Sequence, residues 1–323
     1  MAVIGEFRMY LALKELLRSS QTATWAAHRL RKVRKIGNVE ELDRFFHEVD
    51  SKYPILNDEA TTELQRVCFE LQNGTFTVDP LTEEYRIKQM ELYLEISGKK
   101  EYKFEFESGD FEAEKEKFDF FPYNSRSLRM VSDQLITQGL ILRNIKLPLG
   151  AEIVEFGAGC GNTSLNLALT GYNVTAVEVG KSAGDVIKYR AKVHGREIDV
   201  VNQDMIEFSE KTEKKFDAAL FVASFHHCDD HLRLLGNLNR ILKKDGVIYF
   251  ADEPVVISQS PTVPYPWGLR LDGLSLYFIR KSGWFELGFH YRYLEKAVAK
   301  FGWKLRKTRS PLNGFANFIT AYR

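Results

Sequence analysis

The sequence is poor in the features that mark secreted, disulfide-bonded or membrane-spanning proteins. Its three cysteines, Cys68, Cys160 and Cys228, lie far apart, so they indicate neither a disulfide framework nor a CxxC metal motif. Charged residues interrupt the amphipathic segment 1–20, and no apolar run reaches the length of about 18 residues that a membrane helix needs. The net charge of +1 gives no overall attraction to nucleic acid or to an anionic membrane. We therefore expect a cytoplasmic protein without a transmembrane segment.

The chain is long enough for one large or two ordinary domains, and its apolar content of 44% is that of a packed protein. Residues 1–118 carry no glycine-rich motif and are helix-prone, with Asn57 as a capping residue before a helix. Alternating apolar residues over 92–106 are compatible with a β-hairpin around 97–100, although 82–94 is equally compatible with a helix. The charged segment 108–117 is the expected linker. We predict a smaller, mainly helical or mixed region over 1–118, of unknown role, and a second domain over 119–323.

A glycine-rich motif stands at 153–162. An apolar run containing Glu155 leads into three glycines at alternate positions, followed by Asn162 and an apolar-periodic segment. This order predicts a strand, a tight turn and a helix whose free N–H groups can bind a polar ligand. A dinucleotide motif, GxGxxG, would need a third glycine where Asn162 stands. The pattern is instead E-x-G-x-G-x-G.

Further strand patterns follow, and each ends in polar residues. Glu178 closes a β-rich run, where a strand-end carboxylate could accept hydrogen bonds from a ribose diol, and Asp204 closes the next run. An apolar strand at 216–224 leads into a phenylalanine and two histidines, and 242–253 ends in two acids. Alternation over 303–308 and 315–322 predicts a C-terminal hairpin around 310–314.

Taken together over 120–323, these motifs resemble class I S-adenosylmethionine-dependent methyltransferases. The resemblance implies an α/β fold, with a doubly wound, mostly parallel sheet and an antiparallel C-terminal hairpin. It also implies S-adenosylmethionine as cofactor, with Glu178 on the ribose, Asp204 on the adenine amino group and Met205 against the ring. The predicted cofactor-binding residues are Glu155, Gly157, Ala158, Gly159, Gly161, Glu178, Val179, Asp204, Met205, Tyr123 and Arg126. Tyr123 and Arg126 precede a helix expected to be capped by Asn124 or Ser125, and they could instead only anchor it.

The expected reaction is methyl transfer to a hydroxyl or amine. A base is useful for such acceptors, and the imidazole of His226 or His227 titrates near neutral pH. Only one of the two histidines should act as the base, because neighbouring side chains on an extended segment point to opposite sides. Either histidine could instead only shape the pocket. The strand-end acids Asp252 and Glu253 could orient a hydroxyl, or cap the following loop.

Residues 254–293 are expected to bind the acceptor, because prolines, aromatic rings and charged side chains alternate there. The predicted substrate-binding residues are Trp267, Arg270, Asp272, Arg280 and Trp284. This mixture suits a saccharide-like or ring-shaped small molecule, although part of the segment could be core.

Other functions remain as alternatives. The basic run 28–35 has no interleaved aromatic platform, so it indicates a solvated face or a protein partner of the N-terminal region, and no clear nucleic-acid site. Residues 226–231 include ligand types for zinc but lack a matching downstream set, so no metal is expected. A Rossmann-type NAD oxidoreductase is disfavoured by Asn162, and a catalytically silent cofactor-binding or scaffolding subunit is the other alternative.

Overall fold

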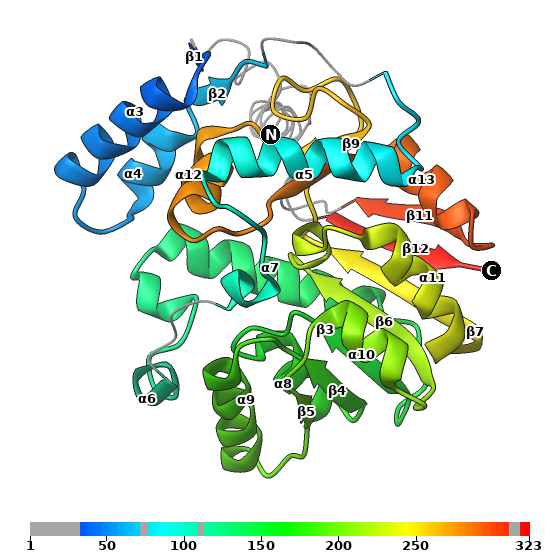
Figure 1. Ribbon diagram of the computed structural model, residues 1–323. Helices are drawn as coiled ribbons and strands as arrows, with labels where there is room; N and C mark the ends of the chain where they lie inside the picture. Colours follow the sequence, from blue (N-terminus) through cyan, green and yellow to red (C-terminus); the bar gives the residue numbers. More distant parts are fainter. Residues whose placement is uncertain (1–32, 72–76, 109–112, 310–316) are drawn as a thin grey trace, which may run out of the picture.

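The computed structural model describes residues 33–71, 77–108, 113–309 and 317–323. Its centre is a seven-stranded sheet with the strand order β11-β12-β7-β6-β3-β4-β5 (Figure 1). The strands are β3 (Glu152–Phe156), β4 (Asn173–Val177), β5 (Asp199–Val201), β6 (Phe216–Val222), β7 (Leu242–Ala251), β11 (Lys304–Arg309) and β12 (Asn317–Tyr322). Strands β3 to β7 are parallel, whereas β12 runs antiparallel to both β7 and β11. The predicted sheet and its C-terminal hairpin are confirmed, although the turn at 310–314 lies outside the described residues.

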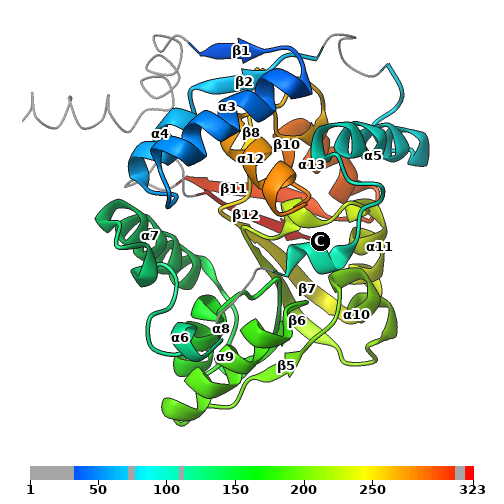
Figure 2. The same cartoon turned by 60° about the vertical axis from the view of Figure 1, so that its left-hand side comes forward.

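Helices cover both faces of this sheet. They are α7 (Leu128–Asn144), α8 (Asn162–Leu169), α9 (Lys181–Val193), α10 (Met205–Lys211), α11 (His231–Ile241) and α13 (Tyr291–Ala299). Figure 2 shows α7, α8 and α9 on one face and α10 and α11 on the other. Because both faces are covered, the central strands are almost continuously apolar and buried, as in β6. The cap of α7 is Ser127, which accepts a hydrogen bond from the Met130 N–H, and not Asn124 or Ser125.

The N-terminal region forms a second layer of helices and short strands. Its elements are β1 (Arg34–Ile36), α3 (Val39–Lys52), α4 (Asp58–Leu64), β2 (Val67–Phe69), α5 (Glu83–Ser97) and η1 (Phe104–Glu107), whereas α6 (Ala113–Glu116) lies against α9. Asn57 caps α4 as expected, and α5 settles the helix-or-hairpin alternative in favour of a helix over most of that segment. Of the basic run, Arg34 and Lys35 are described, and they pair with Glu41 and Glu70. Among the described helices, none is both long and apolar enough to cross a membrane.

The N-terminal layer packs on an insertion that follows β7. The insertion holds β8 (Val255–Val256), β9 (Trp267–Leu269), α12 (Gly273–Lys281) and β10 (Leu287–His290). Tyr85 and Gln89 of α5 donate hydrogen bonds to the carbonyl of Trp267, at 2.9 and 3.1 Å. One apolar cluster runs through the layer, the insertion and the main sheet. The division of the chain into two domains at 118/119 stays a prediction. Residues from both predicted domains belong to this one apolar cluster.

Candidate active site

A cavity of about 650 Å³ lies at the carboxyl ends of the parallel strands. Its lining comes from the glycine-rich turn, from the ends of β4 and β6, from the start of α10 and from η1. Three glycines of the turn, Gly157, Gly159 and Gly161, have φ angles of 65°, 53° and 73°, in the left-handed region that favours glycine. A Cβ on Gly157 would lie 2.6 Å from the Ser224 Cβ, whereas a Cβ on Gly159 would meet no atom within 4 Å. Gly159 therefore leaves open space beside the cavity.

Two acids at neighbouring strand ends line the same cavity. Glu178 follows β4, and its two carboxylate oxygens accept the N–H groups of Gly159 and Gly180 at 2.8 and 2.9 Å. Burial raises the pKa of Glu178, and these backbone donors oppose that shift. Asp204 caps α10, with Oδ1 accepting the N–H groups of Ile206 and Glu207. Glu178 thus holds the turn in place, and Asp204 keeps Oδ2 available to a ligand.

The cavity takes in part of the predicted cofactor set. Those that line it are Gly157, Gly159, Glu178, Val179, Asp204 and Met205. Five others do not line it: Glu155, Ala158, Gly161, Tyr123 and Arg126. Glu155 is buried below the turn and accepts a hydrogen bond from the Ser164 hydroxyl, which ties β3 to α8. Tyr123 packs on Phe120 and Arg126 pairs with Asp119, so both stabilise the chain before α7.

The two histidines lie side by side, contrary to the expectation that they point to opposite sides. Residues Phe225–His227 form a short 3-10 helix, η3, and the two imidazole centroids are 4.2 Å apart. His227 lines the cavity, whereas His226 is buried behind it. The extended backbone assumed from the apolar run has already ended at Val222, where β6 stops.

The pKa values of the two imidazoles are shifted in opposite directions. Burial lowers the pKa of His226 well below its usual range, and the adjacent His227 adds to this effect. Burial also opposes protonation of His227, but the carboxylates of Glu107, Glu286 and Glu253 together outweigh it and raise the pKa of His227 to about 9. The distance from the His227 Nδ1 to the Glu107 Oε2 is 3.0 Å. Neither pKa is close to neutrality, which the sequence argument for a base had assumed.

Asp252 and Glu253 do not line the cavity, so the structure does not place them against an acceptor. The Glu253 carboxylate accepts the backbone N–H groups of Ser224, Phe225 and His226, and it lies 2.8 Å from the His226 Nδ1. Burial raises its pKa to about 7. Asp252 has a φ of 56°, and burial raises its pKa to about 6. Glu253 therefore shapes the loop that carries the histidines.

Of the five predicted substrate residues, Trp284 alone lines the cavity. Trp267 is buried and donates its indole N–H to the Pro80 carbonyl at 2.8 Å. Asp272 caps α12, and Arg280 binds Asp43 of α3. These side chains join the insertion to the N-terminal layer or shape the insertion itself. Arg270 is paired with Glu286 behind the cavity.

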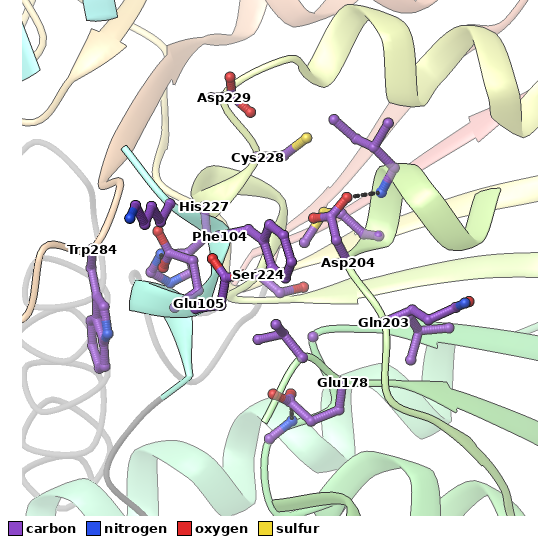
Figure 3. Close-up of a pocket in the computed structure, with 18 of the residues that line it drawn as sticks. Phe104, Glu105, Glu178, Gln203, Asp204, Ser224, His227, Cys228, Asp229 and Trp284 are labelled. Atoms are coloured by element: carbon purple, nitrogen blue, oxygen red, sulfur yellow. Dashed lines mark hydrogen bonds and ion pairs between the residues drawn. The ribbon is translucent and has the colours of Figure 1, made fainter. Parts of the chain in front are cut away.

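The sequence reasoning missed the contribution of the N-terminal region. Segment 102–107 reaches across the cavity with Tyr102, Lys103, Phe104, Glu105 and Glu107. Figure 3 shows His227 and Trp284 on the side away from Glu178 and Asp204, with Phe104 between them. The alternation of aromatic and acidic residues over 102–107 was the available signal, but it was interpreted as part of a hairpin.

Comparisons with known proteins agree with this geometry. The family described as a methyltransferase domain matches residues 154–250. A ubiquinone biosynthesis O-methyltransferase from Pelagibacter ubique is 25% identical over 131 residues, covering 40% of this chain and 53% of the relative. Its namesake from Coxiella burnetii is 30% identical over 102 residues, covering 32% of this chain and 43% of the relative. The chain thus spans about half, or less, of the length of these curated relatives.

A solved magnesium protoporphyrin IX methyltransferase from Synechocystis is 13% identical, with a TM-score of 0.45. The likeness covers 68% of this chain and 93% of that one.

The sheet order, the cavity at its carboxyl edge and the family match place this domain among the class I S-adenosylmethionine-dependent methyltransferases. S-adenosylmethionine is accordingly its cofactor. The residues present fit that group, because Gly159 leaves open space beside the cavity and Asp204 retains a carboxylate oxygen at the next strand end.

Proposed function

We propose that the chain transfers a methyl group from S-adenosylmethionine to a hydroxyl oxygen on a ring-shaped small molecule. The observation that carries this proposal is the cavity, in which the open face of Gly159 stands beside the strand-end carboxylates of Glu178 and Asp204. Gly157 and Gly159 would face the methionine part of the cofactor, and Glu178 would accept the ribose hydroxyls. Asp204 would take the adenine amino group, with Val179 and Met205 against the ring.

When bound, the cofactor supplies a methyl group that its sulfonium makes electrophilic. The part of the protein is then to hold the acceptor oxygen in line and to exclude water. Phe104 and Trp284 (Figure 3), together with Tyr102, supply aromatic surface to the cavity lining. Flat rings pack well on such surfaces.

The ring-shaped acceptor is better supported than a saccharide. Trp267, Arg270, Asp272 and Arg280 suggested a saccharide, and they lie outside the cavity lining. The curated relatives are named as O-methyltransferases of ubiquinone biosynthesis, which supports a hydroxyl acceptor.

Calorimetric titration of the pure chain, with S-adenosylmethionine and with NAD in separate runs, tests the cofactor. We expect binding of S-adenosylmethionine alone. Binding of NAD alone would favour the oxidoreductase instead.

A second assay follows the labelled methyl group from the cofactor to phenols, catechols and sugars. Transfer to phenolic hydroxyls is expected, with S-adenosylhomocysteine formed in equal amount. Transfer to sugars alone would overturn the ring-shaped acceptor. Cofactor binding without transfer to any acceptor would favour a silent subunit.

A further inference from the structure

Behind the cavity, two histidines and one glutamate converge in a way that the methyltransferase motif does not require. His226 and His227 come from η3, and Glu286 comes from the chain just before β10. One possible ligand atom from each of the three residues lies within 4.8 Å of the others. The Oε2 atom of Glu286 is 3.8 Å from the Nε2 atom of His226. Side-chain atoms at this spacing can share a bound cation.

A second carboxylate lies beside each imidazole, and in His226 it is hydrogen-bonded to the ring. Glu253 lies 2.8 Å from the Nδ1 atom of His226, and Glu107 lies 3.0 Å from the Nδ1 atom of His227. Histidines that bind metals usually donate the N–H of one ring nitrogen to such a carboxylate, which orients the ring and leaves the other nitrogen for the metal. In His226 this hydrogen bond leaves the Nε2 atom for a cation, and His227 contributes a ring nitrogen to the same cluster.

Buried groups of both signs surround the cluster. Three carboxylates, from Glu107, Glu253 and Glu286, surround the two rings, and the guanidinium of Arg270 is the cation paired with Glu286. The side chains of Glu253 and Glu286 are almost fully buried, at 1% and 4% exposure. Buried charge is costly unless it is paired, and a cation bound by the imidazoles would keep these carboxylates paired in place of a protonated His227. Arg270 does not prevent this role for Glu286, because a carboxylate offers about four lone-pair sites.

We propose that His226, His227 and Glu286 bind a divalent transition-metal cation of the zinc class. Two imidazole nitrogens and one carboxylate oxygen suit Zn²⁺, Co²⁺ or Fe²⁺ better than Mg²⁺ or Ca²⁺, which prefer oxygen ligands. This set differs from the zinc-like string at 226–231. Cys228 lines the cavity without joining the cluster, and the His231 Nε2 is 2.7 Å from the Tyr293 hydroxyl.

The position of the cluster gives the cation a role. His227 and Trp284 line the cavity on the side opposite Glu178 and Asp204 (Figure 3), so a cation on His227 lies at the wall available to the acceptor. If the proposed function holds, this cation would bind and polarise the acceptor hydroxyl as a Lewis acid, which is an established role of protein-bound metals.

The test is metal binding to the full chain, measured without acceptor or cofactor. The protein is treated with a chelator and dialysed. One sample is then titrated with Co²⁺ while the visible absorption of the bound cation is measured, and another is titrated with Zn²⁺ by calorimetry. We expect one cation per chain. His226→Ala and Glu286→Gln should each weaken binding by about tenfold or more, since changing even an outer partner of a ligand typically costs about 10- to 100-fold.

His231→Gln is the matched control, because His231 is also buried but lies outside the cluster. It should bind Co²⁺ like the wild type. Far-UV circular dichroism checks that each variant is folded, and His227→Ala replaces any variant that is not. Loss of binding in His231→Gln with retention in His226→Ala and Glu286→Gln would overturn the ligand assignment.

Titration of the same samples with S-adenosylmethionine separates this proposal from the proposed function. Cation binding in a chain that does not bind S-adenosylmethionine would support the metal site and contradict the methyltransferase role. Binding of S-adenosylmethionine with no Co²⁺ or Zn²⁺ bound at about 1 mM would overturn the metal site alone, since a Kd above that value corresponds to less than about 4 kcal/mol.

Discussion

Gly159 is the residue at which one added side chain should most directly exclude the cofactor. Its Cβ would enter open space beside the cavity, and its φ of 53° is unfavourable for a branched residue. We expect Gly159→Val to lower the affinity for S-adenosylmethionine by about a hundredfold or more, a loss of at least about 2.7 kcal/mol, because the side chain occupies the space of the methionine part. Calorimetry measures the affinity.

Gly195→Val is the matched control for backbone strain. Gly195 has a φ of 61° and open space around it, but it lies in the turn after α9 and not in the cavity lining. Both variants should lose similar thermal stability, while Gly195→Val should keep its cofactor affinity. Equal losses of affinity would assign the effect to strain and not to the cavity.

His231 should make the protein acid-sensitive. Burial lowers its pKa from 6.5 to about 3 in the folded state. In the unfolded chain His231 therefore takes up a proton near pH 6.5, whereas in the folded chain it does so only near pH 3. The contribution of neutral His231 to the free energy of unfolding is complete above pH 6.5 and declines as the pH falls towards 3. His231→Gln can still hydrogen-bond Tyr293 but does not titrate. Its Tm should fall less than that of the wild type between about pH 7 and about pH 4. An equal dependence of Tm on pH in the wild type and in His231→Gln would contradict this prediction.

At the scale of elements, two helix caps with different surroundings separate stability from binding. Asp204 caps α10 and lines the cavity, whereas Asp272 caps α12 outside it. Replacing either by Ala should cost about 0.5 to 2 kcal/mol of stability, because the helix loses its N-terminal acceptor. Only Asp204→Ala should also weaken cofactor binding. Asp204→Asn should keep the cap and lose affinity alone, as thermal unfolding and calorimetry can show. Weakened cofactor binding in Asp272→Ala would place that helix in the site.

The arrangement of strands and helices also explains how much of the candidate site the sequence could predict. Gly157, Glu178 and Asp204 line one cavity because each follows its own strand, and parallel strands bring their carboxyl ends to one edge. Their binding of the cofactor stays a prediction. Glu107 and Phe104 could not be placed, because segment 102–107 meets the cavity only through tertiary packing. The same packing removed Trp267 from the expected acceptor site, since the insertion binds the N-terminal layer there.

For the whole molecule, the shared core predicts that the N-terminal layer and the methyltransferase domain unfold together. Gly273 of α12 tests their contact, because a Cβ there would lie 2.4 Å from the Leu64 carbonyl oxygen of α4. We expect Gly273→Ala to cost about 1 to 3 kcal/mol through overpacking. Gly139→Ala in α7 is the control. It meets no atom within 4 Å and should be neutral or stabilising by up to about 1 kcal/mol.

The cooperativity of unfolding in urea then shows whether the layer is part of the same structural unit. Two of the four tryptophans, Trp267 and Trp284, lie in the insertion between the layer and the sheet. In a background with Trp25→Phe and Trp303→Phe, tryptophan fluorescence therefore reports on this contact, while far-UV circular dichroism reports on all helices. Coincident transitions are expected in the wild type and in Gly273→Ala, with the midpoint of the variant lower by both probes. If the fluorescence transition of Gly273→Ala moved alone, the layer would unfold separately. Segment 102–107 would then reach the cavity as part of an independently folding region.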